Sequence, residues 1–468
     1  MVIANGYLAK PGEQVLVLGL GRSGCAAAEL LVDLGMRVTV ADAAEGSAPA
    51  ECVATMESHG VTVIRNATAM PPGRFVLCVV SPGLDEELPV VQEAFDRCGE
   101  VISELELGFR NCQCPVLAVT GTNGKSTLTK LLSDMLNASG LRSEPSGNYG
   151  TPLCESARRS GTLDWIVAEV SSFQLELVQR FRPKIGIMLN VQPDHLGRHK
   201  TMSHYTALKA RLFRAMQAGD RALVYAPDAE QIRSAVPEAQ ATDWITFGTD
   251  SGCAVRYDAA RHVAVHAIGG QSVEVSLLGT SFDNPVTGLA AAAAVAAGTL
   301  CGLSADVMQA AISAFVPLSH RMQEVGQIDG VRFVDDSKAT NLTAVQAALM
   351  MTNAPVRLIV GGQLKENDLD FIKEVLKNRV QSAYLIGESS GKFKAAWGNC
   401  IQCVMSGDLK TAVDSAMQDA NPGDVVLLSP ACASFDQFRS YADRGDRFKD
   451  YVHQLAKRRN EEKKKCVI

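Results

Sequence analysis

The chain has 468 residues, of which 21% are charged, and its formal net charge at pH 7 is -6. This length is too great for a single hydrophobic core and predicts about three domains. The weakly negative balance gives no support for a nucleic-acid partner, while local lysines remain able to hold anionic substrates.

Cysteine usage and hydropathy indicate a cytoplasmic protein. Thirteen cysteines are scattered without a framework, which is typical of reduced thiols. The N-terminus lacks the basic and apolar regions of a signal peptide. The most membrane-like run, 288–303, is short and rich in alanine, so we expect a packed helix and no membrane span. No exposed apolar stripe is evident, which favours a monomer.

The first predicted domain is Rossmann-like and ends near residue 103. An apolar strand at 15–18 leads into the G-x-G-x-x-G pattern at 19–24, an alanine-rich helix at 25–34 and a strand ending at Asp42. A second strand ends in a turn around Ser81. Taken alone, this fingerprint favours a nicotinamide-dependent dehydrogenase.

The most informative segment is a predicted phosphate-binding loop at 121–126. It follows the apolar run 116–119 and leads into a helical pattern, so backbone N–H groups and a helix N-terminus face one point. Lys125 adds a positive charge, and Ser126 and Thr127 supply hydroxyls suited to a magnesium ion. The loop is shorter than G-x-x-x-x-G-K-[ST], because Val119 occupies the first glycine position. The alternative is a Gly-rich turn with a solvated lysine.

Two polar side chains follow the next apolar strands, 165–168 and 185–189. Glu169 ends a buried strand, where an unpaired carboxylate is costly and a magnesium ion would neutralise it. His195 follows the second strand. Lys209, on a predicted helix, has the local sequence of a solvated lysine.

The remaining pattern predicts an antiparallel flap or small sheet and then a third α/β section. Short period-two runs occur between 220 and 282. Four apolar strands after Pro317 alternate with helical patterns. The predicted fold class is α/β, with a Rossmann-like domain at 1–103, a central P-loop domain at 104–317 and another Rossmann-like domain at 318–468.

Polar residues gather after three strands of the third section. Asp336, Lys338 and Thr340 form a dense cluster of donors and acceptors, which favours a ligand loop over a plain turn. Lys365 and Ser434 follow two further strands, and each is a weak signal alone.

These segments, in this order, resemble the Mur ligases, the ATP-dependent amide-forming enzymes of peptidoglycan precursor synthesis. The resemblance covers nearly the whole chain and is most specific at 120–127, 146–150, 336–341 and 429–438. The last two segments indicate the D-glutamate-adding branch of the family. The implied reaction adds D-glutamate to UDP-N-acetylmuramoyl-L-alanine, with ATP converted to ADP and phosphate.

The resemblance also implies roles for individual residues. Lys125 would hold the γ-phosphate, and two Mg²⁺ ions would be served by Ser126 or Thr127 with Glu169 and His195. Lys209 would be carbamylated by carbon dioxide and support a metal, and Lys338 would act near the reacting phosphate. The implied ATP contacts are Gly121, Thr122, Asn123, Gly124, Lys125, Ser126, Thr127, Asn284, Arg321 and Asp336. The implied contacts of the UDP substrate are Gly21, Arg22, Ser23, Asp42, Ser81 and Asn148, and those of D-glutamate are Thr340, Lys365, Ser434, Phe435 and Tyr441.

The chain departs from the family pattern in three places. Gly197 replaces a carboxylate of Asp-His-Leu-Asp-Arg-His, and the family's His-Asn-x-x-Asn reads Asp283-Asn284-Pro285-Val286-Thr287. Tyr441 stands where phenylalanine is frequent.

The residue types suit acyl phosphate chemistry. Phosphorylation gives a carboxylate a leaving group, lysine and magnesium stabilise the transferring phosphoryl group, and the amine of D-glutamate then attacks. Domain closure is expected to exclude water. The alternatives are a dehydrogenase, a non-catalytic UDP-sugar sensor, a folylpolyglutamate synthetase or another Mur ligase.

Overall fold

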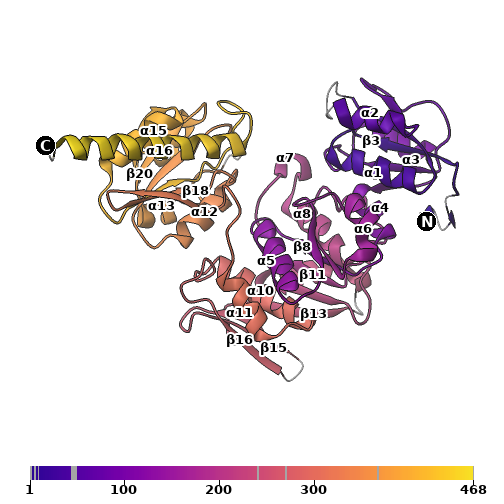
Figure 1. Cartoon of the computed structure of the whole chain (residues 1–468), viewed down its shortest axis with the longest axis horizontal. Coiled ribbons are helices and arrows are strands. Elements are labelled where there is room, and N and C mark those ends of the chain that lie inside the picture. Colours follow the sequence, from indigo (N-terminus) through magenta and orange to yellow (C-terminus); the bar gives the residue numbers. More distant parts are fainter. Residues whose placement is uncertain are drawn as a thin grey trace. The chain divides into compact units, whose positions relative to one another are not determined.

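The computed structural model describes residues 3–4, 7–8, 10–43, 50–239, 242–268, 271–365 and 368–466. The chain forms two compact units (Figure 1), the first made of 1–280 with 288–314 and the second of 281–287 with 315–468. Among the described residues, no helix is both long and apolar enough to cross a membrane.

The first sheet has the order β5-β4-β3-β6-β7, which corresponds to five of the six strands of the Rossmann order, and all its strands are parallel. Its strands are β3 (Gln14–Leu18), β4 (Arg37–Ala41), β5 (Thr62–Ile64), β6 (Leu77–Val80) and β7 (Val101–Ser103). The helices are α1 (Arg22–Asp33), α2 (Ala50–Ser58) and α3 (Pro89–Arg97), and a short hairpin, β1 (Ile3–Ala4) and β2 (Tyr7–Leu8), precedes them.

The central sheet belongs to the same compact unit and has nine strands in the order β16-β15-β14-β13-β12-β11-β8-β10-β9. Its parallel strands are β8 (Val116–Thr120), β9 (Ser143–Gly147), β10 (Trp165–Glu169), β11 (Ile185–Met188), β12 (Arg221–Tyr225), β13 (Asp243–Gly248) and β14 (Val255–Asp258). Strand β8 is buried along its whole length, as expected for a parallel strand covered on both faces.

The helices of this region are α4 (Glu104–Asn111), α5 (Lys125–Ala138), α6 (Leu153–Arg159), α7 (Leu196–His199), α8 (Met202–Ala210), α9 (Ala229–Ala235), α10 (Thr287–Leu300) and α11 (Ala305–Ser313). Helix α10 contains most of the alanine-rich run and is buried along most of its length. The prediction of a packed helix at this run is therefore confirmed.

The predicted antiparallel strands are present, but they extend the central sheet. Strand β14 pairs in parallel with β13, and β15 (Val263–Ile268) and β16 (Gln271–Ser276) follow it in antiparallel pairing. The part of the period-two region before β14 supplies parallel strands, because β12 and β13 are separated by α9.

The second unit contains a six-stranded sheet in the order β17-β18-β22-β19-β20-β21, with only β17 antiparallel. Its strands are β17 (Gln323–Ile328), β18 (Val331–Asp335), β19 (Val356–Gly361), β20 (Val380–Ile386), β21 (Gln402–Gly407) and β22 (Val425–Leu428). Its helices are α12 (Leu342–Met351), α13 (Lys373–Arg379), α14 (Ser390–Trp397), α15 (Leu409–Asp419) and α16 (Tyr441–Cys466).

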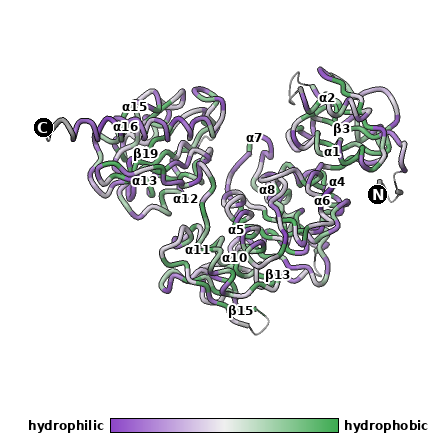
Figure 2. Tube along the Cα trace, viewed as in Figure 1, coloured by the Kyte–Doolittle hydropathy of each residue, from purple (hydrophilic) through white to green (hydrophobic). Residues whose placement is uncertain are grey.

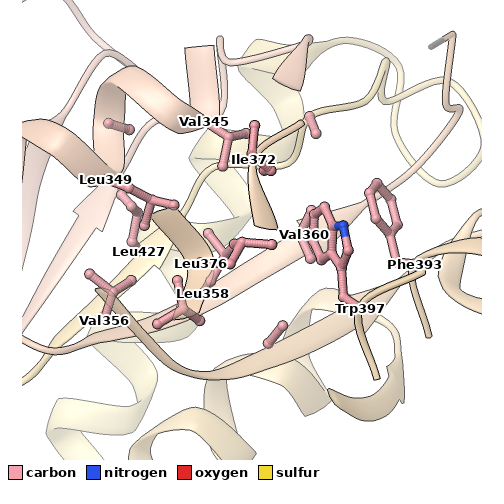
Figure 3. Close-up of a cluster of buried hydrophobic side chains, with 14 of the residues drawn as sticks. Val345, Leu349, Val356, Leu358, Val360, Ile372, Leu376, Phe393, Trp397 and Leu427 are labelled. Carbon is pink, nitrogen blue, oxygen red and sulfur yellow. The ribbon is translucent and has the colours of Figure 1, made fainter. Parts of the chain in front are cut away.

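One face of this sheet packs a core that includes Leu358, Val360, Phe393 and Trp397 (Figure 3). The buried Trp397 indole donates a hydrogen bond to the Leu369 carbonyl at 2.8 Å. Helix α16 is drawn largely in the hydrophilic colour (Figure 2), in keeping with the charged C-terminal run of the sequence.

Candidate active site

The loop between β8 and α5, the predicted phosphate loop, is shaped by two glycines and held by a neighbouring strand. Gly121 and Gly124 have φ angles of 147° and 86°, a region that favours glycine. The backbone N–H groups of Thr122 and Asn123 both donate to Oδ1 of Asn190, at 3.0 Å each. Asn190 follows β11, so the neighbouring strand fixes the loop.

Two lysines converge on one carbonyl of this loop. The Lys125 ammonium donates to the carbonyl oxygens of Gly121 at 2.9 Å and Thr122 at 2.7 Å. The Lys209 amine, from α8, reaches the same Gly121 oxygen at 2.7 Å. The tertiary structure therefore brings Lys209 to the phosphate loop, although its local sequence resembled that of a solvated lysine.

Lys209 is only 1% exposed and lies over the Tyr205 ring, with 4.7 Å between Nζ and the ring centroid. Burial lowers the pKa of Lys209 well below its usual value, and the positive charge of Lys125 lowers it further. Asp194 and Glu169 oppose this shift of the Lys209 pKa. Lys209 thus has a strong tendency to carry a neutral, nucleophilic amine.

Glu169 ends β10, one strand away from the loop, and is 2% exposed. Its Oε1 accepts a hydrogen bond from the Asn148 side chain at 2.6 Å. Within the described part of the chain, no donor reaches its buried Oε2. A buried carboxylate oxygen without a partner is costly, and a divalent cation would satisfy it.

His195 immediately precedes α7 and has a left-handed backbone, with φ of 54°. Its ring packs edge-on against Phe173, at a centroid distance of 4.9 Å. The buried His199 ring stacks on Phe173 and Tyr205 and is hydrogen-bonded to Ser172 at 3.0 Å. Burial is the main cause that lowers the pKa of His199 to about 4, so this imidazole is neutral at pH 7.

The predicted metal ligands are chemically suited to Mg²⁺. Hydroxyl and carboxylate oxygens of Ser126, Thr127 and Glu169 are hard donors, and the unpartnered Oε2 of Glu169 fits a cation. In the described ranges, no cluster of three or more His, Cys, Asp or Glu side chains has the arrangement of a metal site.

The three glycines of the G-x-G-x-x-G turn in the first sheet have different surroundings. Two of them lie against protein atoms, and one does not. A Cβ on Gly24 would lie 1.9 Å from the Gly19 carbonyl oxygen, and one on Gly19 would lie 2.8 Å from Ser81. A Cβ on Gly21, which precedes α1, would meet no protein atom within 4 Å. Protein packing therefore requires Gly19 and Gly24, whereas Gly21 leaves room for close approach by a ligand.

The other predicted UDP contacts lie around this turn. Asp42 follows β4 and accepts a hydrogen bond from the Leu20 backbone. The Ser81 hydroxyl donates to the Gly19 carbonyl at 3.4 Å. Arg22 is exposed and donates to the carbonyl of Gly150, in the same loop as Asn148, and Ser23 follows it in α1.

In the second unit, two neighbouring aspartates at the end of β18 have different environments. Asp335 is fully buried and hydrogen-bonded to His320 at 2.7 Å. Asp336 accepts hydrogen bonds from Ser429 at 2.9 Å and from the Met322 backbone at 3.3 Å. Burial raises the pKa of Asp336 to about 7, partly opposed by these bonds and by Arg321.

A buried arginine, missed in the sequence, joins the loops of this region. Arg444 on α16 is 0% exposed and donates to the hydroxyl and carbonyl of Ser337, at 2.9 and 2.8 Å, and to the carbonyl of Cys432 at 3.1 Å. Its sequence context, on a helix rich in charged residues, gave no signal. Gln363 and Ala433 also pair through two backbone hydrogen bonds of 2.9 and 3.0 Å, linking the loop after β19 to the loop after β22.

The predicted D-glutamate contacts come from these loops. Lys338 lies over the Tyr441 ring, with 3.8 Å between Nζ and the centroid. Ser434 is buried, whereas the Phe435 side chain is 67% exposed. Thr340 is half-buried in the loop after β18, and Lys365 is exposed after β19.

Asn284 uses its side chain close to the start of α10. Its Oδ1 accepts from the backbone of Val286 and Thr287 at 3.1 and 2.9 Å, and its Nδ2 donates to the Thr287 hydroxyl at 2.6 Å. Thr287, one of the departures from the family pattern, is therefore part of the turn that holds Asn284.

Comparisons with known proteins match this arrangement along the chain. Residues 13–103 match the Mur ligase MurD-like, N-terminal domain, 119–296 the Mur ligase middle domain, and 320–432 the Mur ligase, glutamate ligase domain. Two similar relatives carry the name UDP-N-acetylmuramoylalanine--D-glutamate ligase. The relative from Desulfatibacillum aliphaticivorans is 36% identical, covering 95% of this chain and 99% of its own. The one from Syntrophus aciditrophicus is also 36% identical and covers 95% and 98%.

Solved structures show the same fold at lower identity. MurF ligase from Thermotoga maritima in complex with ADP has a TM-score of 0.59 at 17% identity and covers 96% of both chains. A pseudomurein peptide ligase type C from Methanothermus fervidus has a TM-score of 0.58 at 17% identity, covering 95% of this chain and 100% of its own.

Proposed function

The chain belongs to the Mur ligase family, and we infer that it is the ATP-dependent ligase that joins D-glutamate to UDP-N-acetylmuramoyl-L-alanine in peptidoglycan precursor synthesis. The observation that carries this function is the convergence of Lys125, Lys209 and the phosphate loop on one edge of the central sheet. The matched stretches also lie within 1–103, 104–317 and 318–468, which supports these ranges as the three domains.

The reaction activates the carboxylate of the UDP substrate as an acyl phosphate. The N-terminus of α5 and the ammonium of Lys125 are suited to the transferring phosphoryl group, on which negative charge is spread in the transition state. Arg321, Asp336 and Asn284 are proposed as further ATP contacts. The amine of D-glutamate then attacks the acyl carbon, and phosphate leaves.

Like the rest of its family, the enzyme uses Mg²⁺, which would neutralise phosphate charge when bound. Ser126 or Thr127, Glu169 and His195 are the proposed ligands, and two ions are proposed. The unpartnered Oε2 of Glu169 supports this role. Asn148 fixes the other oxygen of Glu169, so the carboxylate presents Oε2 in one orientation.

Lys209 is proposed to carry a carbamate formed from carbon dioxide. Carbamylation needs a neutral amine, and the amine of Lys209 is buried beside a second ammonium. The product is an anion with two oxygens, which would turn an unfavourable buried cation into a partner for Lys125 and a metal ion. The Tyr205 ring faces the Lys209 Nζ, and the Tyr205 hydroxyl is hydrogen-bonded to Thr122 of the loop at 3.3 Å.

The UDP moiety is proposed to bind at Gly21, Arg22, Ser23, Asp42 and Ser81, with Asn148 near the muramoyl group. Gly21→Ala should weaken binding of the UDP substrate about tenfold without unfolding the protein, because its Cβ would meet no protein atom. Gly24→Ala is the matched control and should instead destabilise the domain, since its Cβ collides with the Gly19 carbonyl. Titration calorimetry and thermal melting separate the two effects. Unchanged affinity in Gly21→Ala would place the ligand elsewhere.

D-Glutamate is proposed to bind at Thr340, Lys365, Ser434, Phe435 and Tyr441. The cation of Lys365 suits a carboxylate of the amino acid, and Lys338 is proposed to act near the reacting phosphate. Arg444 supports this site by joining the loops that carry Lys338 and Ser434.

The function is tested by phosphate release from ATP with UDP-N-acetylmuramoyl-L-alanine. D-Glutamate should stimulate release, whereas L-glutamate, meso-diaminopimelate and buffer alone should not. Lys125→Ala should abolish release and leave affinity for the UDP substrate largely intact, because the two ligands use different sheets. Phosphate release that is indifferent to D-glutamate refutes the assignment.

A further inference from the structure

The short helix α7 connects His195, a predicted metal ligand, to the first sheet, where the UDP moiety is proposed to bind. It begins directly after His195, and the backbone N–H of Arg198 donates to the His195 carbonyl at 2.9 Å. Left-handed residues bound the segment on both sides, since Lys200 has a φ of 64°. The position of His195 is therefore tied to the position of Arg198.

The Arg198 guanidinium reaches the first sheet from this helix. Its Nη2 donates to the carbonyl of Leu84 at 2.9 Å, and its Nε lies 3.4 Å from the Asp85 carboxylate. The backbone N–H of Leu84 in turn donates to the carbonyl of Ser81 at 3.0 Å. The Arg198 guanidinium therefore holds the turn that follows β6. Ser81, at the start of this turn, contacts Gly19 of the G-x-G-x-x-G turn.

The guanidinium is also held from within the central domain. Nη2 also donates to the carboxylate of Glu176 at 2.5 Å, and the guanidinium lies 4.8 Å from the centroid of Phe173. Phe173 packs against His195 at 4.9 Å. Glu176 is 7% exposed on its side chain and Arg198 is 19% exposed, so this pair is far better shielded than an ordinary surface ion pair.

We propose that Arg198 is a positioning residue that couples occupancy of the UDP-substrate site to the placement of His195, an inference that rests on the proposed function. The guanidinium presents several N–H donors in a fixed plane, so Nη2 holds the Leu84 carbonyl and the Glu176 carboxylate while Nε faces Asp85. Ordering of the 81–85 turn by the UDP substrate then orders α7 and the imidazole that precedes it. Binding of the nucleotide and metal at the phosphate loop is favoured in return, since coupling between two sites is reciprocal.

The chain provides a matched control for this coupling. Arg158 on α6 also joins the two sheets, through ion pairs of 2.5 Å to both Glu29 and Asp33 on α1. Neither of these ion pairs involves α7 or the turn after Ser81. Loss of Arg158 therefore removes a contact between the same two sheets without touching the proposed connection.

The test measures the dissociation constant of a non-hydrolysable ATP analogue with Mg²⁺, with and without saturating UDP-N-acetylmuramoyl-L-alanine. In the unaltered enzyme the UDP substrate should tighten binding of the analogue by about fivefold or more, the lower range for coupled sites. Arg198→Met should reduce this factor to about 1, and Arg158→Ala should preserve it. Arg198→Lys should give an intermediate factor, because an ammonium keeps the charge and lacks the fork.

Each outcome decides the question. A full coupling factor in Arg198→Met overturns the proposal, as does an equal loss in Arg158→Ala or the absence of coupling in the unaltered enzyme. If Arg198→Met does not fold, Arg198→Lys decides. An intermediate coupling factor in Arg198→Lys supports the proposal, and an unchanged factor overturns it. Phosphate release that depends on D-glutamate in the unaltered enzyme is measured in parallel, so failure of the coupling is distinguished from failure of the assigned reaction.

Discussion

Two buried cations, one in each compact unit, show opposite ways of placing positive charge inside a protein. Lys209 in the first unit is 1% exposed and Arg444 in the second is 0% exposed. Burial lowers the pKa of both, but that of Arg444 remains about 10 and that of Lys209 falls well below its ordinary value. At neutral pH, Arg444 therefore stays a fixed cation, whereas Lys209 is driven towards a reactive amine.

Part of this contrast is intrinsic, because the ordinary pKa of arginine is higher than that of lysine, and the different partners add to it. Arg444 donates three hydrogen bonds to Ser337 and Cys432, which compensate much of its lost hydration. Lys209 donates to the Gly121 carbonyl, which also accepts from the Lys125 ammonium. A shared acceptor and a neighbouring like charge favour loss of the proton. The comparison indicates that hydrogen-bond partners help a buried side chain to keep its charge.

The largest expected effect is that of replacing Lys209. Lys209→Ala should lower kcat by about 10²- to 10³-fold, the range for removing one preorganised electrostatic group. Short carboxylic acids should restore part of the rate, because they supply the oxygens of the proposed carbamate. Lys209→Arg keeps the cation and cannot form a carbamate, so it should be equally impaired.

Lys130→Ala is the control for these variants. Lys130 pairs with Asp134 on α5 at 2.5 Å, and 25% of its side chain is exposed. Its replacement should leave kcat nearly unchanged. A Lys209→Arg enzyme with near-normal turnover would show that Lys209 acts as a cation. Carboxylic acids that fail to restore any activity in Lys209→Ala would count against the carbamate.

Replacing Arg444 should act on stability first. Arg444→Met leaves the carbonyls of Ser337 and Cys432 without their donor and should lower the free energy of unfolding of the second unit by about 3 kcal/mol. Urea denaturation measures this change. The KM for D-glutamate should rise as well, because the two loops lose their common partner.

Arg439→Ala is the matched control, since its side chain is 88% exposed and lies 3.7 Å from Asp443. It should change the free energy of unfolding by less than about 0.5 kcal/mol. If the Arg444→Met protein is as stable as the unaltered one, the hydrogen bonds of Arg444 do not stabilise the second unit.

The smallest effect concerns a buried group far from the chemistry, His266 on β15. It is 2% exposed, and among the described residues neither ring nitrogen has a hydrogen-bond partner. Burial lowers the pKa of His266 below its ordinary 6.5. The unfolded chain therefore binds the proton more readily, so the contribution to stability is present above pH 6.5 and is lost as the pH falls towards the folded-state pKa.

His266→Leu should accordingly lose less stability than the unaltered protein between pH 7 and pH 5. Denaturant unfolding at several pH values measures the difference. His453→Gln, at an exposed position on α16, should show no such change. If His266→Leu and His453→Gln both lose as much stability as the unaltered protein between pH 7 and pH 5, the burial of His266 does not cause the loss of stability at low pH.

Local sequence predicted much of the fold, because parallel strands buried on both faces are continuous apolar runs. The runs at 116–119 and 356–360 became β8 and β19. Strand β17 escaped notice because its sequence, Gln323–Ile328, is largely polar and lies at a sheet edge. Pairing with β18 makes it a strand, and that pairing is a tertiary contact.

The sequence by itself determined the family, the phosphate loop and the order of the three α/β sections, since each rests on a contiguous motif or a periodic pattern. Only the tertiary structure decided that Lys209 lies at the phosphate loop, that Arg444 is buried and that Arg198 joins two sheets. These properties depend on desolvation and on partners distant in the chain. A charged residue on a helix has the same local pattern whether its side chain meets water or a buried carbonyl.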